Sequence, residues 1–152
     1  MKVAFLYAGQ GSQHVGMGQD LYEQYPQFRE IFDNAQLDFD LKKLCFEGPE
    51  ETLSQTQYTQ PCMVAFAAGV TAILRDAGIR PELAAGLSLG EYSALHAAGV
   101  FDAQTAISLV AFRGKAMAEA VTGRPCGMAA ILQLDRDKLQ AACDGASDVG
   151  VV

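Results

Sequence analysis

The chain has 152 residues, half of them apolar, which suffices for one ordinary domain with a buried core. Its 11 Lys and Arg stand against 18 Asp and Glu, a formal net charge of −7. This acidic balance argues against nucleic acid and against an anionic membrane surface as partners. No apolar run is long enough to span a membrane.

The start of the chain predicts a buried strand over 3–8, followed by a glycine-rich loop over 9–18. Because only a short apolar stretch precedes the glycines, this start does not resemble a signal peptide. The segment 20–35 is amphipathic and predicts a helix broken by Pro26. The letters "GPEETL" predict a short helix after Pro49.

The middle of the chain alternates helices with a second strand. Residues 59–77 are apolar nearly all round, which predicts a buried helix that ends at Gly78. A short buried strand is predicted over 83–87, and the helix after Ser88 should stop at Gly99. Asp102 is a candidate N-cap for a helix that runs to about 121.

The last part of the chain has a different character. The stretches 127–134, 135–145 and 149–152 predict a strand, a helix and a second strand that is cut short.

The four cysteines lie far apart in the sequence: Cys45, Cys62, Cys126 and Cys143. They form no CxxC pair, and both histidines lie far from them, which argues against a zinc site. We expect reduced thiols in a cytoplasmic protein.

Ser88 stands between two glycines, in Gly86-Leu87-Ser88-Leu89-Gly90, where a strand meets a helix. This is the G-x-S-x-G pattern, in which a tight strand-to-helix turn exposes a serine hydroxyl. The helix N-terminus behind the serine offers free N–H groups to developing negative charge. The same letters also fit a serine that only caps the helix.

Two further segments favour a catalytic site. Gln10, between two glycines after the first strand, can bring its backbone N–H or its side chain close to a ligand. Arg113 shares a helix face with the apolar residues Leu109, Val110, Ala116 and Met117. A guanidinium on an apolar face needs an anion, although a snorkelling arginine at the rim of the core is the alternative.

Four motifs occur in order: "GQGSQ", "GLSLGEYSAL", an arginine–glycine pair at 113–114, and "GMAAI". Together they resemble malonyl-CoA:acyl carrier protein transacylase, the acyltransferase family of fatty acid and polyketide synthesis. The resemblance covers essentially all of this chain but only the N-terminal half of such an enzyme. Two departures are Leu87, where the family often has histidine, and Tyr-Ala-Gly-Gln in the first loop, where Phe-Pro-Gly-Gln is common.

The resemblance implies an α/β fold and a mechanism. Residues 1–125 would form part of a large subdomain with a parallel sheet, similar to the α/β-hydrolase arrangement. Residues 126–152 would begin a small ferredoxin-like subdomain. Ser88 would accept malonyl from coenzyme A and pass it to the phosphopantetheine thiol of acyl carrier protein. The N–H groups of Gln10 and Leu89 would form the oxyanion hole, and Arg113 would bind the malonyl carboxylate. Neither a metal nor a tightly bound cofactor is implied.

The base that the family uses is a histidine that has no counterpart here. His14 is interpreted as a solvated loop residue, and His96, about two helical turns after Ser88, as a helix-surface or satellite-core residue. Glu91 suits the helix dipole rather than base catalysis. We therefore expect a chain that is weak or inactive alone, with exposed apolar surface that recruits a C-terminal half or causes self-association. A truncated chain, a proteolytic fragment, a split enzyme and a degenerate copy all fit this pattern.

Two alternatives stay open. A serine esterase could use the same turn, but it would have no use for an inward Arg113. A non-catalytic module that binds carrier protein would take no acyl group on Ser88. Acyl carrier proteins are themselves acidic, so docking would need a local basic patch such as Lys115 or Arg124.

Overall fold

The computed structural model describes residues 2–123 and 131–147, which fall into two compact units, Met1–Thr122 and Gly123–Val152. The first unit holds two strands and seven of the helices described, and the second holds one helix. The elements, in chain order, are β1 (Ala4–Tyr7), α1 (Gln19–Gln24), α2 (Pro26–Asp33), α3 (Leu41–Glu47), α4 (Glu50–Leu53), α5 (Thr56–Asp76), β2 (Leu83–Gly86), α6 (Gly90–Ala97), α7 (Ala103–Ala120) and α8 (Arg136–Gly145).

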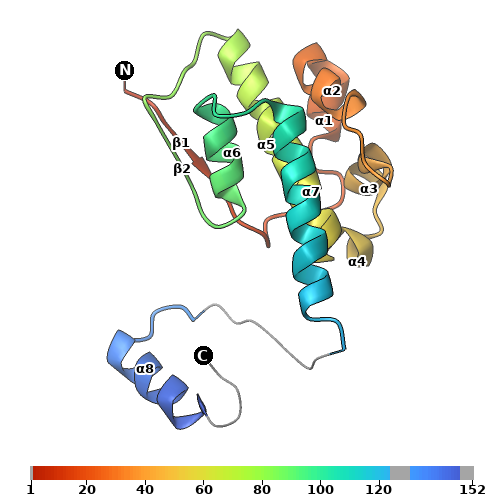
Figure 1. The fold of residues 1–152 in the computed structure, drawn as a ribbon. Coiled ribbons are helices and arrows are strands. Elements are labelled where there is room, and N and C mark those ends of the chain that lie inside the picture. The colour runs from red at the N-terminus through yellow and green to blue at the C-terminus, as the bar shows by residue number, and fades with distance from the viewer. Residues whose placement is uncertain (1, 124–130, 148–152) are drawn as a thin grey trace. The chain divides into compact units, whose positions relative to one another are not determined.

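The two strands form a small parallel sheet, with Ala4 opposite Leu83 and Tyr7 opposite Gly86. Both strands were predicted within a residue of these bounds, and the predicted α/β class is confirmed. The long connection between them, which parallel pairing requires, contains α1 to α5. Figure 1 shows the strands at one edge of the first unit, with α6 beside them and α5 and α7 beyond.

Residues along both strands alternate between exposed and half-buried, as the twofold period of a strand dictates. One face is turned toward the helices, and the Tyr7 hydroxyl lies 2.8 Å from Thr71 Oγ1 of α5. The other face is open, where Leu6 is 80% and Leu83 is 73% exposed. Two large apolar side chains are thus left uncovered on a short parallel sheet, which normally has both faces covered.

Helix α5 is the centre of the first unit and confirms the predicted buried helix. It contacts α2, α6 and α7, and it packs most extensively against α7. At Gly69, an added Cβ would lie only 2.4 Å from the Phe28 ring. Because Gly69 has no side chain, the fully buried Phe28 of α2 can pack directly on α5.

The predicted helix boundaries rest on capping and on proline. The Asp102 carboxylate accepts a hydrogen bond from the Thr105 N–H at 2.7 Å, so Asp102 is the N-cap of α7. The predicted break at Pro26 is confirmed, since α1 ends before it and α2 begins with it. Helix α3 was not predicted, although Asp40 caps it by accepting from the Lys43 N–H at 3.0 Å.

The second unit confirms one predicted element and corrects another. Helix α8 matches the predicted helix over 135–145. Residues 131–134 are not in a strand, contrary to prediction. A strand needs a hydrogen-bonded neighbour, and the described part of this unit provides none. The remaining parts of the two predicted strands, 127–130 and 149–152, lie outside the described residues, and the subdomain assignments of 1–125 and 126–152 stay predictions.

Two of the cysteines meet inside the first unit. Cys45 of α3 and Cys62 of α5 are both fully buried, and their thiols are free. A hydrogen bond with Cys62, together with burial, raises the pKa of the Cys45 thiol. Cys45 is therefore held as a neutral core residue rather than as a reactive thiolate.

Candidate active site

Ser88 lies at the turn between β2 and α6, with its backbone in the left-handed region at φ +52°. Residues other than glycine adopt this conformation at a cost of about 1–3 kcal/mol. The turn is closed by two hydrogen bonds, from the Gly90 N–H to the Leu87 carbonyl at 2.9 Å and from the Glu91 N–H to the Ser88 carbonyl at 3.2 Å. The exposed Ser88 hydroxyl thus sits on a strained strand-to-helix turn, which we call the elbow (residues 86–90).

The two glycines of the elbow are required by packing. A Cβ on Gly86 would lie 1.9 Å from the Gly90 carbonyl carbon, and a Cβ on Gly90 would lie 2.3 Å from the Tyr7 carbonyl oxygen. Both contacts are with backbone, which cannot move aside as a flexible side chain can. A larger residue at Gly86 must therefore push β2 away from the start of α6, and a larger residue at Gly90 must push α6 away from β1.

The loop after β1 runs directly beside the elbow. The Leu87 N–H donates to the Tyr7 carbonyl at 3.2 Å, and a Cβ on Gly9 would lie 2.9 Å from the Leu87 carbonyl oxygen. Gln10 follows Gly9, and its side-chain amide donates to Thr56 Oγ1 at 3.0 Å. Within the described residues, the backbone N–H groups of Gln10 and Leu89 donate no hydrogen bond.

Arg113 of α7 reaches the elbow. Its Nη2 donates to Ser88 Oγ at 3.2 Å, and its Nη1 donates to Gln60 Oε1 of α5 at 2.8 Å. Its guanidinium carbon lies 5.7 Å from the centre of the Tyr92 ring. The half-buried guanidinium is thus fixed on three sides by neutral groups. Of the described carboxylates, none lies within 4.0 Å of it.

The surroundings of Arg113 on α7 differ from the sequence prediction. Val110 is fully buried, but Leu109 is 42% and Met117 is 38% exposed, and Ala116 is exposed as well. The predicted apolar face therefore lies partly in the core and partly at the surface, because only one edge of it packs on α5. Lys115, suggested as part of a basic docking patch, is exposed and lies 4.0 Å from Asp38. Arg124 lies outside the described residues.

Sequence reasoning missed Gln60 and Tyr92 as neighbours of Arg113. Gln60 is fully buried, and its amide nitrogen contacts Met117 Sδ at 3.4 Å. A glutamine within the apolar run 59–77 was the available signal, because a buried amide must find hydrogen-bond partners. Tyr92 gave no signal, since its position follows from how α6 packs against α7.

Neither histidine contacts Ser88. His14 is exposed in the loop after β1. His96 is buried at the C-terminal end of α6, where its Nδ1 lies 3.1 Å from the Phe101 carbonyl oxygen. Both interpretations as non-catalytic residues agree with these positions. Arg113 is the one hydrogen-bond partner of Ser88 Oγ among the described residues.

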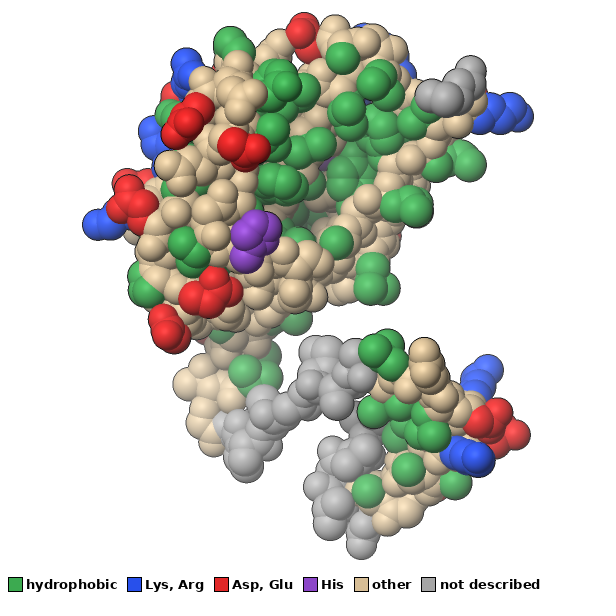
Figure 2. Space-filling model, turned by 180° about the vertical axis from the view of Figure 1, so that it is seen from behind, with side chains coloured by type: hydrophobic (Ala, Val, Ile, Leu, Met, Phe, Trp, Pro, Cys, Tyr) green, Lys and Arg blue, Asp and Glu red, His purple; other side chains and the backbone are tan. Residues whose placement is uncertain are grey.

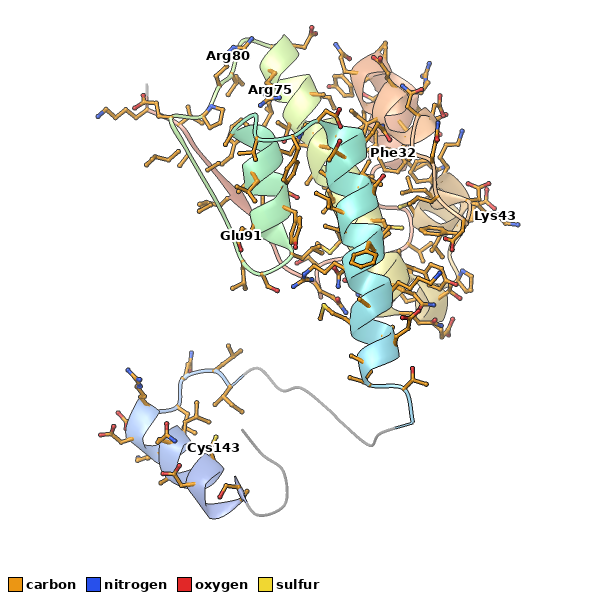
Figure 3. All side chains as sticks on the ribbon, viewed as in Figure 1. Phe32, Lys43, Arg75, Arg80, Glu91 and Cys143 are labelled. Atoms are coloured by element: carbon orange, nitrogen blue, oxygen red, sulfur yellow. The ribbon has the colours of Figure 1, made fainter. Side chains whose placement is uncertain are left out.

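The cations Arg75 and Arg80 lie near the end of α6 that is away from the serine. Figure 3 shows Glu91 at the end of α6 that carries the elbow, and Arg75 and Arg80 near the opposite end. Arg75 donates to the Ala97 carbonyl at 2.7 Å and so satisfies the C-terminal end of α6. Among the described residues, Arg113 is therefore the cation that hydrogen-bonds to Ser88.

Burial of His96 predicts acid sensitivity. Desolvation lowers the pKa of His96 below 6.5, with a smaller contribution from Arg75. The folded state favours the neutral imidazole of His96. The contribution of His96 to the free energy of unfolding is therefore complete above its unfolded-state pKa and is lost as the pH falls below about 6.5. We expect the free energy of unfolding, measured with urea, to be smaller at about pH 5.5 than at about pH 7.5. His96→Gln should reduce this decline and His14→Gln should not; equal declines in wild type and His96→Gln would contradict the assignment.

An apolar cavity of about 400 Å³ lies between β1 and α5. It is lined by β1, by the loop after it and by one side of α5, and Leu89 and Ser93 border it beneath the elbow. Figure 2 shows hydrophobic side chains gathered around a hollow in the first unit. Ser88 and Arg113 do not line this cavity, although Leu89 of the elbow does.

The family model described as "Acyl transferase domain" matches residues 4–151. The chain belongs to this acyl transferase family. It is 43% identical to the malonyl CoA-acyl carrier protein transacylase of Bacillus subtilis (strain 168), with 98% of this chain and 48% of the relative aligned. The corresponding protein of Escherichia coli (strain K12) is also 43% identical, over 98% of this chain and 49% of the relative. The resemblance predicted from the sequence is thus confirmed.

Solved acyltransferase structures agree with this assignment. The malonyl CoA-acyl carrier protein transacylase of Clostridium perfringens superposes with a TM-score of 0.89 at 35% identity, covering 99% of this chain and 48% of that one. A transacylase in complex with a type II polyketide acyl-carrier protein gives a TM-score of 0.87 at 41% identity, covering 98% and 49%. The chain spans about half the length of the relatives it matches.

The part of this acyltransferase chain that the structure describes contains no helix both long and apolar enough to cross a membrane.

Proposed function

We propose that this chain takes part in transfer of a malonyl group from coenzyme A to the phosphopantetheine thiol of acyl carrier protein, in fatty acid or polyketide synthesis. The observation that carries the proposal is the 3.2 Å contact between Arg113 Nη2 and Ser88 Oγ. It puts a cation beside a strained, exposed hydroxyl. That pairing suits a thioester that also bears a free carboxylate.

In the first half-reaction, Ser88 Oγ attacks the thioester carbonyl of malonyl-CoA. The C–S bond breaks, coenzyme A leaves as the thiol, and an ester forms on Ser88. The serine proton passes to a base and then to the leaving sulfur. In the second half-reaction, the carrier protein thiol attacks this ester, the C–O bond breaks, and the proton returns to Ser88 Oγ.

The free N–H groups beside the serine fit an oxyanion hole. Those of Gln10 and Leu89 lie on the two segments that meet at the elbow, and one such donor is worth roughly 3 kcal/mol of transition-state stabilisation. The positive end of α6, which begins at Gly90, favours the same charge. These two donors are our candidates for binding the carbonyl oxygen during both half-reactions.

Arg113 is our candidate for the group that selects the substrate. Its planar guanidinium can bind a carboxylate through two parallel N–H bonds. Acetyl offers no such group and would leave the cation unpaired, at a cost on the order of 3 kcal/mol if it becomes buried. Malonyl and methylmalonyl both carry the free carboxylate, so Arg113 accommodates either.

The base belongs to a second polypeptide segment in this proposal, because both histidines of the chain lie away from Ser88. A C-terminal half of the acyltransferase domain would supply it. The open sheet face at Leu6 and Leu83 and the apolar cavity beside β1 are the surfaces we assign to that half. Apolar surface of this kind also promotes self-association when the partner is absent.

The test is intact-mass spectrometry after mixing the chain with malonyl-CoA, alone and with the C-terminal half of the Bacillus subtilis relative. We expect a malonyl adduct that disappears in Ser88→Ala. Without the half, the adduct should form about 10²- to 10⁴-fold more slowly, since the base is missing. No adduct in either mixture, under conditions that label the intact relative, would contradict the proposal and would favour a non-catalytic module that binds carrier protein.

A serine esterase remains the second candidate because it uses the same elbow. Arg113 separates the two, since hydrolysis of a neutral ester gains nothing from a guanidinium beside the nucleophile. An esterase would lose little activity on Arg113→Ala and would turn over neutral esters faster than malonyl-CoA.

A further inference from the structure

We infer that Gln60 is the residue that positions Arg113 and, by being neutral, keeps the arginine's charge for the substrate carboxylate. This inference rests on the proposed function. It concerns a side chain that contacts Arg113 but not Ser88, and it makes a prediction about substrate selection rather than about the chemical step.

The backbone brings Gln60 to Arg113. Gly114, next to Arg113, packs so closely on α5 that an added Cβ would lie 2.8 Å from the Thr56 carbonyl oxygen and 2.9 Å from the Gln57 Cα. Gln60 lies one helical turn beyond these residues on the same face of α5. The close approach of the two helices therefore determines which α5 side chain reaches the guanidinium.

The orientation of the Gln60 amide is determined by its second contact. The amide NH₂ faces Met117 Sδ at 3.4 Å, a weak acceptor, and this leaves Oε1 toward Arg113 Nη1 at 2.8 Å. The reversed amide would place two donors against each other. Because Gln60 is fully buried, no water competes for Oε1. Arg113 Nη1 is thereby held, and Nη2 is directed to Ser88.

A neutral partner has a consequence that a carboxylate would not have. The groups around the guanidinium are an amide, a hydroxyl and an aromatic ring, from Gln60, Ser88 and Tyr92. They satisfy its hydrogen bonds without cancelling its charge. A resident glutamate at 60 would form an ion pair with Arg113, and an incoming malonyl carboxylate would then have to compete with it.

The experiment compares Gln60→Glu and Gln60→Met with wild type, each in the presence of the C-terminal half. The readout is the ratio of the rates at which malonyl-CoA and acetyl-CoA label Ser88. We expect Gln60→Glu to lower this ratio by about tenfold or more, mainly by slowing malonyl, since a hydrogen bond to a charged group is worth about 1.5–3 kcal/mol. Gln60→Met, which loses the acceptor but adds no charge, should lower the ratio less.

A matched control uses Gln55→Glu, which makes the same change at an exposed position just before α5. It should leave the ratio at the wild-type value. A ratio in Gln60→Glu within about twofold of wild type would overturn the inference. If Gln60→Glu does not fold, the same criterion applies to Gln60→Met, which preserves volume.

A readout that needs no acyl transfer separates this inference from the proposed function. Phenylglyoxal modifies arginine, and the Arg113 peptide can be followed by mass spectrometry. Malonate should protect Arg113 in wild type and Gln55→Glu but not in Gln60→Glu, and acetate should protect none of them. Protection in Gln60→Glu equal to wild type would refute the inference alone. A wild type that is neither protected by malonate nor acylated would refute the proposed function and the inference together.

Discussion

Replacing Arg113 with alanine is expected to slow malonyl labelling of Ser88 by about 10- to 100-fold, because a charge-assisted, bidentate carboxylate contact is lost. Acetyl labelling should not slow and should become faster, since alanine removes the cation that acetyl leaves unpaired. The measurement is the rate of each adduct by intact-mass spectrometry in the presence of the C-terminal half. The effect should therefore appear in the ratio of the two rates rather than in both rates equally.

Two further variants make this result specific. Arg113→Lys keeps a positive charge but loses the planar fork, so it should give an intermediate ratio. Lys115→Ala removes a cation from the same helix, but that cation is exposed and points to Asp38, so the ratio should not change. Equal slowing of malonyl and acetyl in Arg113→Ala would indicate a structural role and would contradict carboxylate recognition.

Replacing Gly86 with alanine is expected to disrupt the elbow. The new Cβ would lie 1.9 Å from the Gly90 carbonyl carbon and 2.0 Å from its oxygen, so β2 and α6 must separate. Overpacking costs about 1–3 kcal/mol even where side chains can adjust, and here only backbone is available to move. We expect the free energy of unfolding, measured with urea, to fall by at least about 3 kcal/mol and Ser88 labelling to be lost.

Gly145→Ala provides the matched control for this prediction. Gly145 ends α8, and an added Cβ there meets no atom within 4 Å. Alanine should leave stability unchanged or raise it by up to about 1 kcal/mol, because it is the better helix former. If Gly86→Ala and Gly145→Ala had the same free energy of unfolding and the same rate of Ser88 labelling, the packing account of the elbow would be wrong.

The elements that local patterns specify were predicted from the sequence. The cap at Asp102, the break at Pro26 and the apolar run that became α5 each depend on neighbouring residues, and each lies within a few residues of its predicted bounds. Helix α3 was missed because its seven residues are too few to show a clear period. The strand expected over 127–134 is absent from its described part, 131–134, because a strand depends on a partner that no local pattern reveals.

In the candidate site too, local patterns indicated some features, and others depend on how the helices pack. The glycines at 86 and 90 indicated a tight turn at Ser88, and the apolar setting of Arg113 indicated an anion. The contact between Ser88 and Arg113 depends on how α6 packs beside α7, which the sequence expresses only through resemblance to a family. Gln60 could have been noticed as a polar residue in a buried helix, but its partner became evident only in three dimensions.

The most direct test of the central claim is a competition between malonyl-CoA and acetyl-CoA at equal concentration, with the C-terminal half present and the adduct located by peptide mass spectrometry. The account predicts that malonyl is the main adduct and that it is carried by the peptide containing Ser88. Acetyl in equal or greater amount, or malonyl bound at another residue, would contradict it.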